Sequence, residues 1–315
     1  MTTGSVTLLE AAQSGSDLLK AGVVETLIQE SPILEQLPQT TIQGNAIKHE
    51  EEVSLPSPEF RSVNESYNRS FGSDKEHFWG TTILGGEVFV DNYLVKVRGN
   101  VTDIKRKQYV KMAKAMGRTF DKTFFDGTGA AKDFKGVNTL ISEGFGQLYG
   151  AAADATNGGS LTLADLDVAH DLMRGQSSAD AMLLSRAARR AITTLARGSG
   201  VGYPYIDVDV DKFGRQIQTW NGIPMRIIGD DVGGTAILGA DETRGSSTDC
   251  SSLYLVSYGE DENVTGLLGA GGSFEVKDFG ETEAAPGHLG RVEVYPGIAI
   301  YNKYSIVRVD GIRNL

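Results

Sequence analysis

Cysteine, proline and long apolar runs are scarce in this sequence. Its 315 residues include one cysteine, Cys250, and eight prolines. A single cysteine excludes an internal disulfide, which suits a reducing compartment or a fold held by packing. No run of about 18 apolar residues occurs, so no membrane-spanning helix is expected. Residues 1–15 also lack the basic and apolar regions of a signal peptide.

Positive charge is also in short supply. The chain has 30 Lys and Arg against 41 Asp and Glu, a formal net charge of −11. This balance argues against nucleic-acid binding by bulk electrostatics and favours solubility. The charge is uneven, however, because residues 102–125 contain seven basic and two acidic side chains.

The segment FFDGTGAAKDFKGVNTLI (124–141) has glycines and lysines but lacks the spacing of a phosphate-binding loop. Such a loop follows a strand and has lysine directly after glycine. Here a helical pattern precedes Gly127 and Gly129, and Lys135 precedes Gly136. We interpret the segment as a hinge after a helix, with Phe134 and Val137 tucked against the body.

Metal and catalytic patterns are incomplete as well. DVDVDKFG (207–214) has Lys212 where a calcium loop needs glycine. The four histidines lack ligand spacing for zinc, and no nucleophile elbow occurs. Of Glu50, Glu51 and Glu52, only the first and last share a strand face. We therefore predict no catalytic, metal or cofactor residues and a protein that is not an enzyme.

A helix is predicted from Asp17 to Ser31, where Pro32 stops it. Leu19, Val23 and Leu27 form its apolar stripe, which must be buried on the chain's own body or on a neighbouring subunit. We assign these three residues to contacts between subunits.

The stretch from Gly44 to Val97 is predicted to be an extended hairpin. A strand begins GNAIKHEEEV, and a second, EVFVDNYLVKV, alternates from Val88 to Val97. About thirty polar residues with interspersed aromatics separate them, more than an ordinary connection needs. We expect this hairpin to lie on a partner subunit. The contact residues assigned to it are Glu50, Glu52, Phe71 and Trp79.

A long helix is predicted from Thr102 to about Phe125. Its basic stripe has three interpretations: a solvated face, pairing with acidic segments of a neighbour, or contact with nucleic-acid phosphates without base reading. The stripe consists of Lys107, Lys111, Lys114, Arg118 and Lys122.

The remainder mixes helices and strands without regular alternation, which favours an α+β fold. LTLADLDVAHDLMRG has Thr162 as a helix cap, with Asp165 at the capping-box position. AMLLSRAARRAITTLARG indicates a strand and a helix capped by Ser185. Asn221-Gly222 is a hairpin turn signal, and the last third is almost entirely strands.

The order of these parts resembles the major capsid proteins of tailed bacteriophages, with the Hong Kong 97-type fold. The matching segments are LLKAGVVETLIQESPILEQLP, the excursion 44–97, the helix 102–125 with the segment that leaves it, ADAMLLSRAARRAITTLARG, QTWNGIPMRIIGDD and GRVEVYPGIAIYNKYSIVRVDGI. Their order and spacing cover nearly the whole chain.

The resemblance implies a fold with named parts. These are an N-terminal arm (1–44), an extended E-loop with flanking strands (45–98), a peripheral domain (99–158) with its spine helix at about 102–125, an axial domain (159–258), return strands of the peripheral domain (259–301) and a final axial strand (302–315).

It also implies a structural protein of the virion that assembles in the host bacterial cytoplasm. Pentamers and hexamers of the chain would form an icosahedral shell around double-stranded DNA, contacted through its backbone by the basic stripe. Only residues 1–44 precede the E-loop, so we expect no cleaved scaffolding domain. Separate scaffolding, portal and decoration proteins are candidate partners. No covalent crosslink is predicted, although Lys75 lies in the E-loop.

Two alternatives remain open at this point. An encapsulin, a shell that encloses an enzyme, has the same fold and would carry a pocket for a cargo peptide. A soluble α+β enzyme would be a compact monomer with small-molecule turnover.

Overall fold

We describe the fold from a computed structural model of the chain. It describes residues 18–98, 101–130, 132–150, 156–174, 178–198, 206–210, 214, 216–269, 274–283 and 285–313.

A mixed sheet buried on both faces forms the centre of the fold. Its β11 (Ser247–Val256) pairs antiparallel with β16 (Ile306–Ile312) and with β6 (Ala181–Leu184). Successive β11 residues point to opposite faces, so Tyr254 belongs to one hydrophobic core and Leu255 to the other. Burial on both faces explains why these strands are continuous apolar runs.

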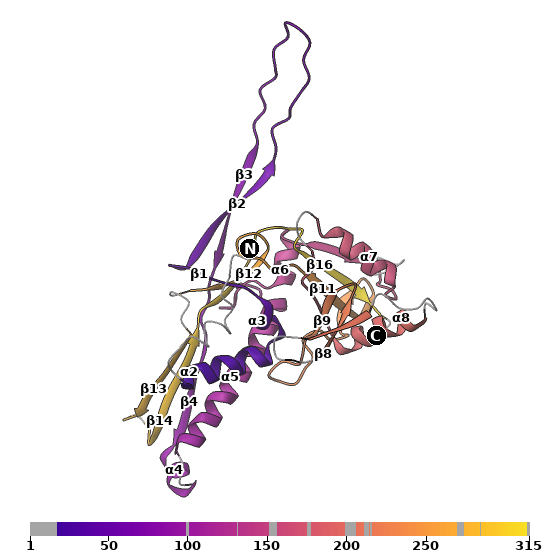
Figure 1. The fold of residues 1–315 in the computed structure, drawn as a ribbon. Helices are drawn as coiled ribbons and strands as arrows, with labels where there is room; N and C mark the ends of the chain where they lie inside the picture. Colours follow the sequence, from indigo (N-terminus) through magenta and orange to yellow (C-terminus); the bar gives the residue numbers. More distant parts are fainter. Residues whose placement is uncertain are drawn as a thin grey trace.

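Two helices cover one face of this sheet (Figure 1). They are α7 (Leu163–Leu172) and α8 (Arg186–Gly198). The predicted capping box is confirmed, because the Thr162 hydroxyl accepts from Asp165 N and the Asp165 carboxylate accepts from Thr162 N. Ser185 Oγ accepts from Ala188 N at 3.1 Å, as predicted for the second helix.

The sheet continues through a tight hairpin at Asn221-Gly222. Both turn residues have positive φ, 49° and 80°, which a two-residue turn of this hand requires. The strand order is β5-β16-β11-β6-β9-β8-β7, with β10 paired to β11. The strands not yet bounded are β5 (Gln147–Gly150), β7 (Ile206–Val210), β8 (Gln216–Trp220), β9 (Ile223–Ile227) and β10 (Glu242–Arg244).

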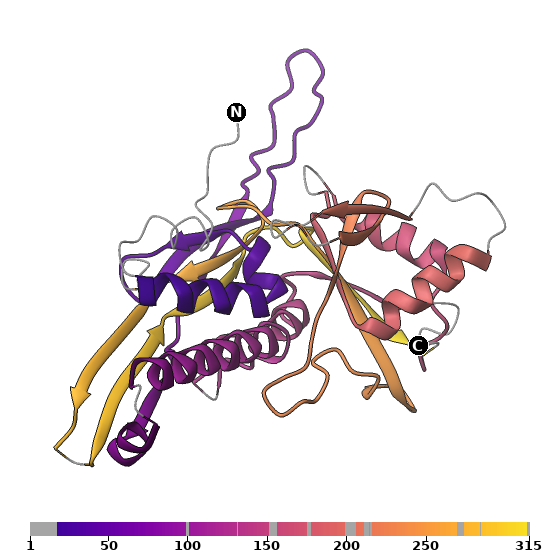
Figure 2. The same cartoon turned by 60° about the horizontal axis from the view of Figure 1, so that its bottom comes forward.

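The long helix α5 (Val101–Asp126) leads away from the other face of the sheet. Its 26 residues span about 39 Å at about 1.5 Å per residue. The helix was predicted from Thr102 to about Phe125, so both ends are confirmed within one residue. α2 (Leu18–Glu30) lies beside it (Figure 2), and α3 (Pro32–Gln36) follows after Ser31.

Strands extend alongside α5 in two further sheets. In one, β14 (Gly287–Val294) lies between β13 (Glu275–Glu281) and β4 (Leu84–Asp91). In the other, β12 (Val264–Leu268) lies between β1 (Gln39–Thr41) and β15 (Pro296–Ile300).

The strand predicted from Val88 to Val97 is only half correct. It ends at Asp91, and α4 (Asn92–Arg98) follows. The Asp91 carboxylate accepts a hydrogen bond from Tyr93 N at 2.7 Å, which turns the backbone into the helix. The partner of β4 is β14, so β4 is not a side of the predicted hairpin.

The hairpin itself consists of β2 (Ala46–Ser54) and β3 (Ser73–Gly80). Its return strand was therefore predicted too late in the sequence. β3 is mostly exposed and polar, so it lacks the alternation that marks a half-buried strand. Figure 1 shows the hairpin projecting far from the body.

The hinge predicted after α5 is confirmed. Phe134 and Val137 are buried, and α6 (Val137–Ser142) packs against α5. Gly127 N donates to Thr123 O at 2.9 Å, and Gly136 N donates to Gly127 O at 2.7 Å. Backbone thus contacts backbone at Gly127, and no phosphate-loop geometry is formed.

Gly127→Ala should lower the free energy of unfolding by about 3 kcal/mol. An added Cβ would collide with Phe134 O and lie 2.6 Å from Thr123 O. The matched control is Gly22→Ala in α2, where a Cβ meets no atom within 4 Å. That change should stabilise the protein by about 0.5–1 kcal/mol. Denaturant unfolding measures both; equal effects would contradict the close packing of the hinge.

Candidate assembly interface

The inner face of the hairpin base packs on the body of the same chain. Trp79 is 5% exposed, and its ring centroid lies 4.9 Å from that of Phe145. His77 also contacts Phe145 edge-on at 4.6 Å, and its Nε2 lies 3.0 Å from Glu51 Oε2. Trp79 was predicted to contact a neighbouring subunit. That prediction is wrong, because its own chain covers the side chain.

The outer face of the hairpin base is acidic. Glu50 lies opposite Glu76, and Glu52 lies opposite Asp74. Like charges facing each other across strands repel. Lys48 alone bridges two of them, Glu50 at 2.8 Å and Glu76 at 2.7 Å. These two hydrogen bonds raise the pKa of Lys48 to about 12.

Glu52 is exposed, and no lysine or arginine among the described residues pairs with it. Glu50 is exposed too, and Lys48 lowers its pKa. Both glutamates remain available to a neighbouring subunit, as the sequence predicts. We call Glu50, Glu52, Asp74 and Glu76 the acidic face.

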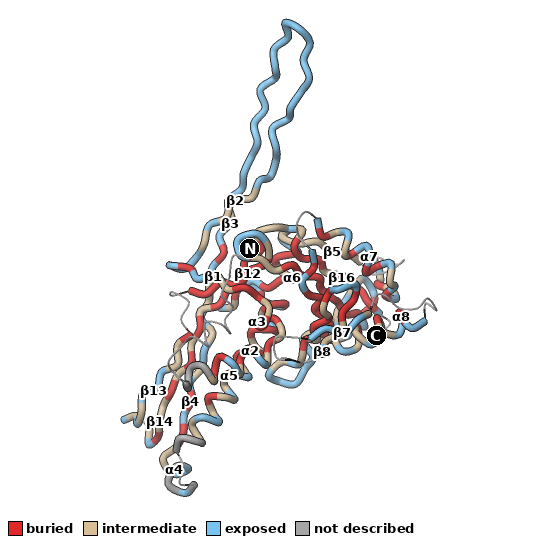
Figure 3. The backbone as a smooth tube through the Cα atoms, viewed as in Figure 1, coloured by how far each residue is buried: buried red, intermediate tan, exposed pale blue. Residues whose placement is uncertain are grey.

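The tip of the hairpin, residues 55–72, is exposed along its whole length (Figure 3), and it includes large apolar residues. Polar contacts shape the tip internally: Ser70 Oγ donates to Ser57 O at 3.0 Å, and Arg61 lies 5.2 Å from the Tyr67 ring centroid. Phe71 is 85% exposed. Several large apolar side chains exposed on one segment make the tip a candidate site of interaction. The exposed apolar side chains of the tip are Leu55, Phe60, Val63, Tyr67 and Phe71.

The basic stripe on α5 divides into two parts. Lys114 and Arg118 both pair with Glu30 of α2, at 2.9 and 3.3 Å. Burial opposes ionisation of Glu30, but these two cations outweigh it and lower its pKa. Lys122 pairs with Asp231 at 2.8 Å. These three members are therefore neutralised by carboxylates of their own chain.

The other two members, Lys107 and Lys111, are exposed and have no carboxylate partner within the described residues. Arg106 beside them is exposed in the same way. We call Arg106, Lys107 and Lys111 the free basic patch. The sequence pattern could not separate these residues from the paired lysines and arginine. The carboxylates that pair with the stripe lie 84 or more positions away along the chain; Glu30, for example, lies 88 positions from Arg118.

The apolar stripe of α2 faces its own chain. Val23 and Leu27 are 2% and 3% exposed and lie in the core that contains α5. Their assignment to contacts between subunits is therefore wrong, since almost no surface remains for a neighbour. The side chain of Leu19 lies outside the described part of the structure.

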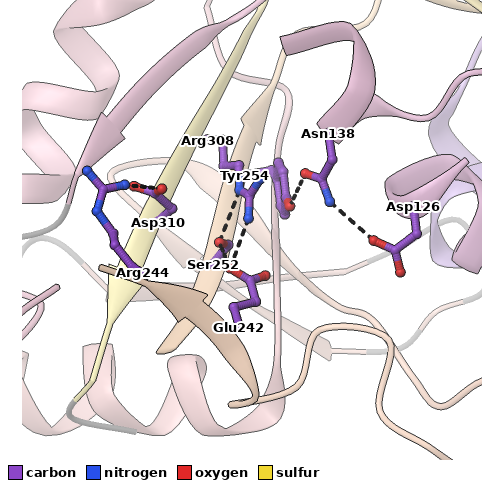
Figure 4. Close-up of polar contacts among 8 residues, drawn as sticks. All are labelled: Asp126, Asn138, Glu242, Arg244, Ser252, Tyr254, Arg308 and Asp310. Atoms are coloured by element: carbon purple, nitrogen blue, oxygen red, sulfur yellow. Dashed lines mark hydrogen bonds and ion pairs between the residues drawn. The ribbon is translucent and has the colours of Figure 1, made fainter. Parts of the chain in front are cut away.

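A polar network joins the end of α5 to the central sheet (Figure 4). Asn138 Nδ2 donates to Asp126 at 3.2 Å, and Tyr254 OH donates to Asn138 Oδ1 at 2.7 Å. The Arg308 guanidinium lies 5.8 Å from the Tyr254 ring centroid and donates to Glu242 at 2.9 Å. Ser252 Oγ bonds to Glu242, and Arg244 pairs with Asp310. Local sequence patterns do not reveal this network, because its members are spread over 185 positions from Asp126 to Asp310.

Within the described residues, no group of three or more His, Cys, Asp or Glu is placed to hold a metal ion. No helix in the described ranges has the length and apolar character needed to cross a bilayer.

No protein-family model and no curated protein matches this chain. Solved structures do match it. The SrpI encapsulin of Synechococcus elongatus PCC 7942, in a holo complex, aligns with 90% of this chain and 87% of its own at a TM-score of 0.67 and 15% identity. The capsid of a native GTA particle aligns over 90% of both chains at 0.61 and 10% identity.

A third match is to Microbacterium phage Oxtober96, with 89% of this chain and 90% of that one covered, a TM-score of 0.60 and 14% identity. These likenesses show that the chain has the Hong Kong 97-type capsid fold. The α+β fold predicted from the sequence is therefore confirmed.

Replacing Phe60 and Phe71 by serine should abolish association between subunits while changing the free energy of unfolding of the single subunit by less than about 0.5 kcal/mol. Both side chains are exposed, so only a partner can bury them. Sedimentation measures association, and denaturant unfolding measures stability.

Trp79→Ala is the control for this pair. It removes a buried ring from the subunit itself, so it should cost about 3–5 kcal/mol of stability. If the double serine variant destabilises the single subunit to a similar degree, the tip packs on its own chain instead.

Proposed function

We propose that this chain is the major capsid protein of a tailed bacteriophage. Copies of it form pentamers and hexamers of an icosahedral shell that encloses double-stranded DNA. The observation that carries the proposal is the hairpin, whose acidic face and apolar tip lie outside the chain's own core. The capsid likenesses at about 90% coverage support it.

The two hydrophobic cores support the proposed assignment of parts. The core that contains α5 corresponds to the proposed peripheral domain, and the core that contains α7 and α8 corresponds to the proposed axial domain. The central sheet lies between them and contributes side chains to both. Residues 18–44 form the proposed N-terminal arm, and the hairpin is the proposed E-loop.

A second function has a specific observation in its favour. The encapsulin likeness has the higher TM-score, 0.67 against 0.61 and 0.60. In this alternative the same shell encloses a protein cargo. The fold of the subunit is common to both functions, so the contents of the shell decide between them. The soluble enzyme is the weakest candidate, because an unsupported hairpin is a liability in a monomer.

Electron microscopy of the purified full-length protein tests the proposal. Closed shells would support the proposal that this chain is a shell protein. A monodisperse monomer would overturn that proposal. Nuclease-protected double-stranded DNA inside particles from infected cells supports the phage capsid. A protein cargo without DNA supports the encapsulin.

The free basic patch is the proposed contact with the DNA backbone. Lysine and arginine at a free helix face bind phosphates without reading sequence. The patch is small and the chain is acidic overall, so each subunit would bind DNA weakly. The binding free energies of many copies would add up in a particle. The neighbour's acidic face is the alternative partner for the same side chains.

The double variant Lys107→Gln/Lys111→Gln should lower the DNA content of particles and leave the yield of empty shells unchanged. Quantification of packaged DNA and electron microscopy of shells give the two readings. Loss of shells in the variant would assign the patch to a neighbouring subunit. The matched control is Lys114→Gln, which breaks a pair with Glu30 and should leave DNA content unchanged.

A further inference from the structure

A buried carboxyl lies where α2, α3 and α5 meet. Asp121 of α5 is 2% exposed. Its hydrogen-bond partner among the described residues is Ser31, whose hydroxyl donates to Asp121 Oδ1. Ser31 also caps α3, since its Oγ accepts from Leu34 N at 3.1 Å. A carboxylate with a single donor is poorly compensated for the loss of water.

The charges around Asp121 do not compensate this carboxyl for its loss of water. Burial raises the pKa of Asp121 to about 8, against the lowering effect of the Ser31 hydroxyl, and the negative charge of Glu30 adds to the rise. The cations of this part of α5 pair with other carboxylates: Lys114 and Arg118 with Glu30, and Lys122 with Asp231. Asp121 is therefore neutral at pH 7.

Titratable side chains of two other elements lie in the same region. Tyr258, which follows β11, is partly buried, and its pKa is raised by desolvation and by the charges of Asp180 and Asp121. Arg226 of β9 is buried and donates to Glu35 of α3 at 3.1 Å. This pair also links α3 to the central sheet.

Leu18–Gln36, which we call the α2–α3 arm, is thus fixed to α5 and to the sheet by three polar links. These are Glu30 with its two cations, Ser31 with Asp121, and Glu35 with Arg226. Glu30 and Glu35 make ion pairs with basic side chains. Asp121 has no such ion pair in the described residues, so its burial disfavours the charged form of this carboxyl.

We propose that the α2–α3 arm is a pH-sensitive clamp, held on α5 while Asp121 is neutral and loosened when this carboxyl ionises. Release of the arm would expose Asp121 to water, where a carboxyl has its ordinary pKa of about 4. The clamped state then binds one proton more than the released state between the two pKa values. The clamp is consequently tightest in acid.

The sign of the effect follows from this difference in bound protons. The opening equilibrium of the arm should rise about tenfold per pH unit above about pH 4. The rise should level off near pH 8, where Asp121 ionises in the clamped state as well. This inference does not depend on whether the chain forms a phage capsid or another shell.

Hydrogen exchange of the full chain, corrected for the intrinsic pH dependence of amide exchange, tests the clamp. Between pH 5.5 and 7.5 we expect the corrected opening of α2 and α3 amides to increase by about a hundredfold, which is tenfold per unit over two units. Amides of β11 should remain protected at each pH, because the arm opens without global unfolding.

Asp121→Asn should remove the pH dependence of arm opening, since asparagine stays neutral. The matched control is Asp126→Asn on the same helix, whose side chain bonds to Asn138 of α6 and not to the arm. This control should retain the full slope. Equal slopes in the wild type and in Asp121→Asn would overturn the proposal, as would α2 amides that exchange together with those of β11.

A measurement on the wild type covers the case in which Asp121→Asn does not fold. Infrared spectra in heavy water resolve the carbonyl band of a protonated, buried carboxylic acid. A band that titrates with a midpoint near pH 8 supports the proposal. The absence of any protonated carboxyl band at pH 7 would overturn it.

Discussion

The proposed function depends on one constraint: the hairpin cannot bury the apolar side chains of its tip on its own chain. Its base is fixed, because Trp79 and His77 pack on Phe145 and the strands join the body there. Its tip has no such support. Phe60 and Phe71 each expose an aromatic ring, which costs free energy in water. In the proposed shell, a second copy of the chain would remove this cost in every subunit at once.

The body from which the hairpin projects is joined by several contacts. Consecutive residues of β11 enter different cores, so the two halves of the body share one sheet and cannot separate without exposing it. The network from Asp126 to Arg308 adds directional contacts across the same junction. On the other side, the α2–α3 arm ties α5 to β9. In the proposed shell, a rigid body of this kind would transmit position from one subunit to the next.

Local sequence signals predicted much of this structure. The Thr162 cap, the Asn221-Gly222 turn and the length of α5 each depend on a few neighbouring residues, and each is confirmed. The α4 helix was missed because a short apolar run also fits a strand. Partners distant in the sequence were not accessible in this way. Glu30 neutralises two members of the basic stripe from 84 and 88 positions away, so the stripe could not be divided without the structure.

The same reason explains the errors in the predicted interface. An apolar residue on an exposed element must be buried, but the sequence does not say whether its own chain or a neighbour covers it. Val23, Leu27 and Trp79 are covered by their own chain, whereas Phe71 is not. The predicted partner surface stays a prediction for the part of the hairpin that the body does not reach.

Hydrogen exchange of residues 55–72, compared between dissociated subunits and assembled particles, tests the central claim most directly. The tip has few backbone contacts of its own, so its amides should exchange freely in the single subunit. In particles they should become protected, because a neighbouring copy covers them. Equal protection in both states would contradict the claim that the hairpin exists to bind another subunit.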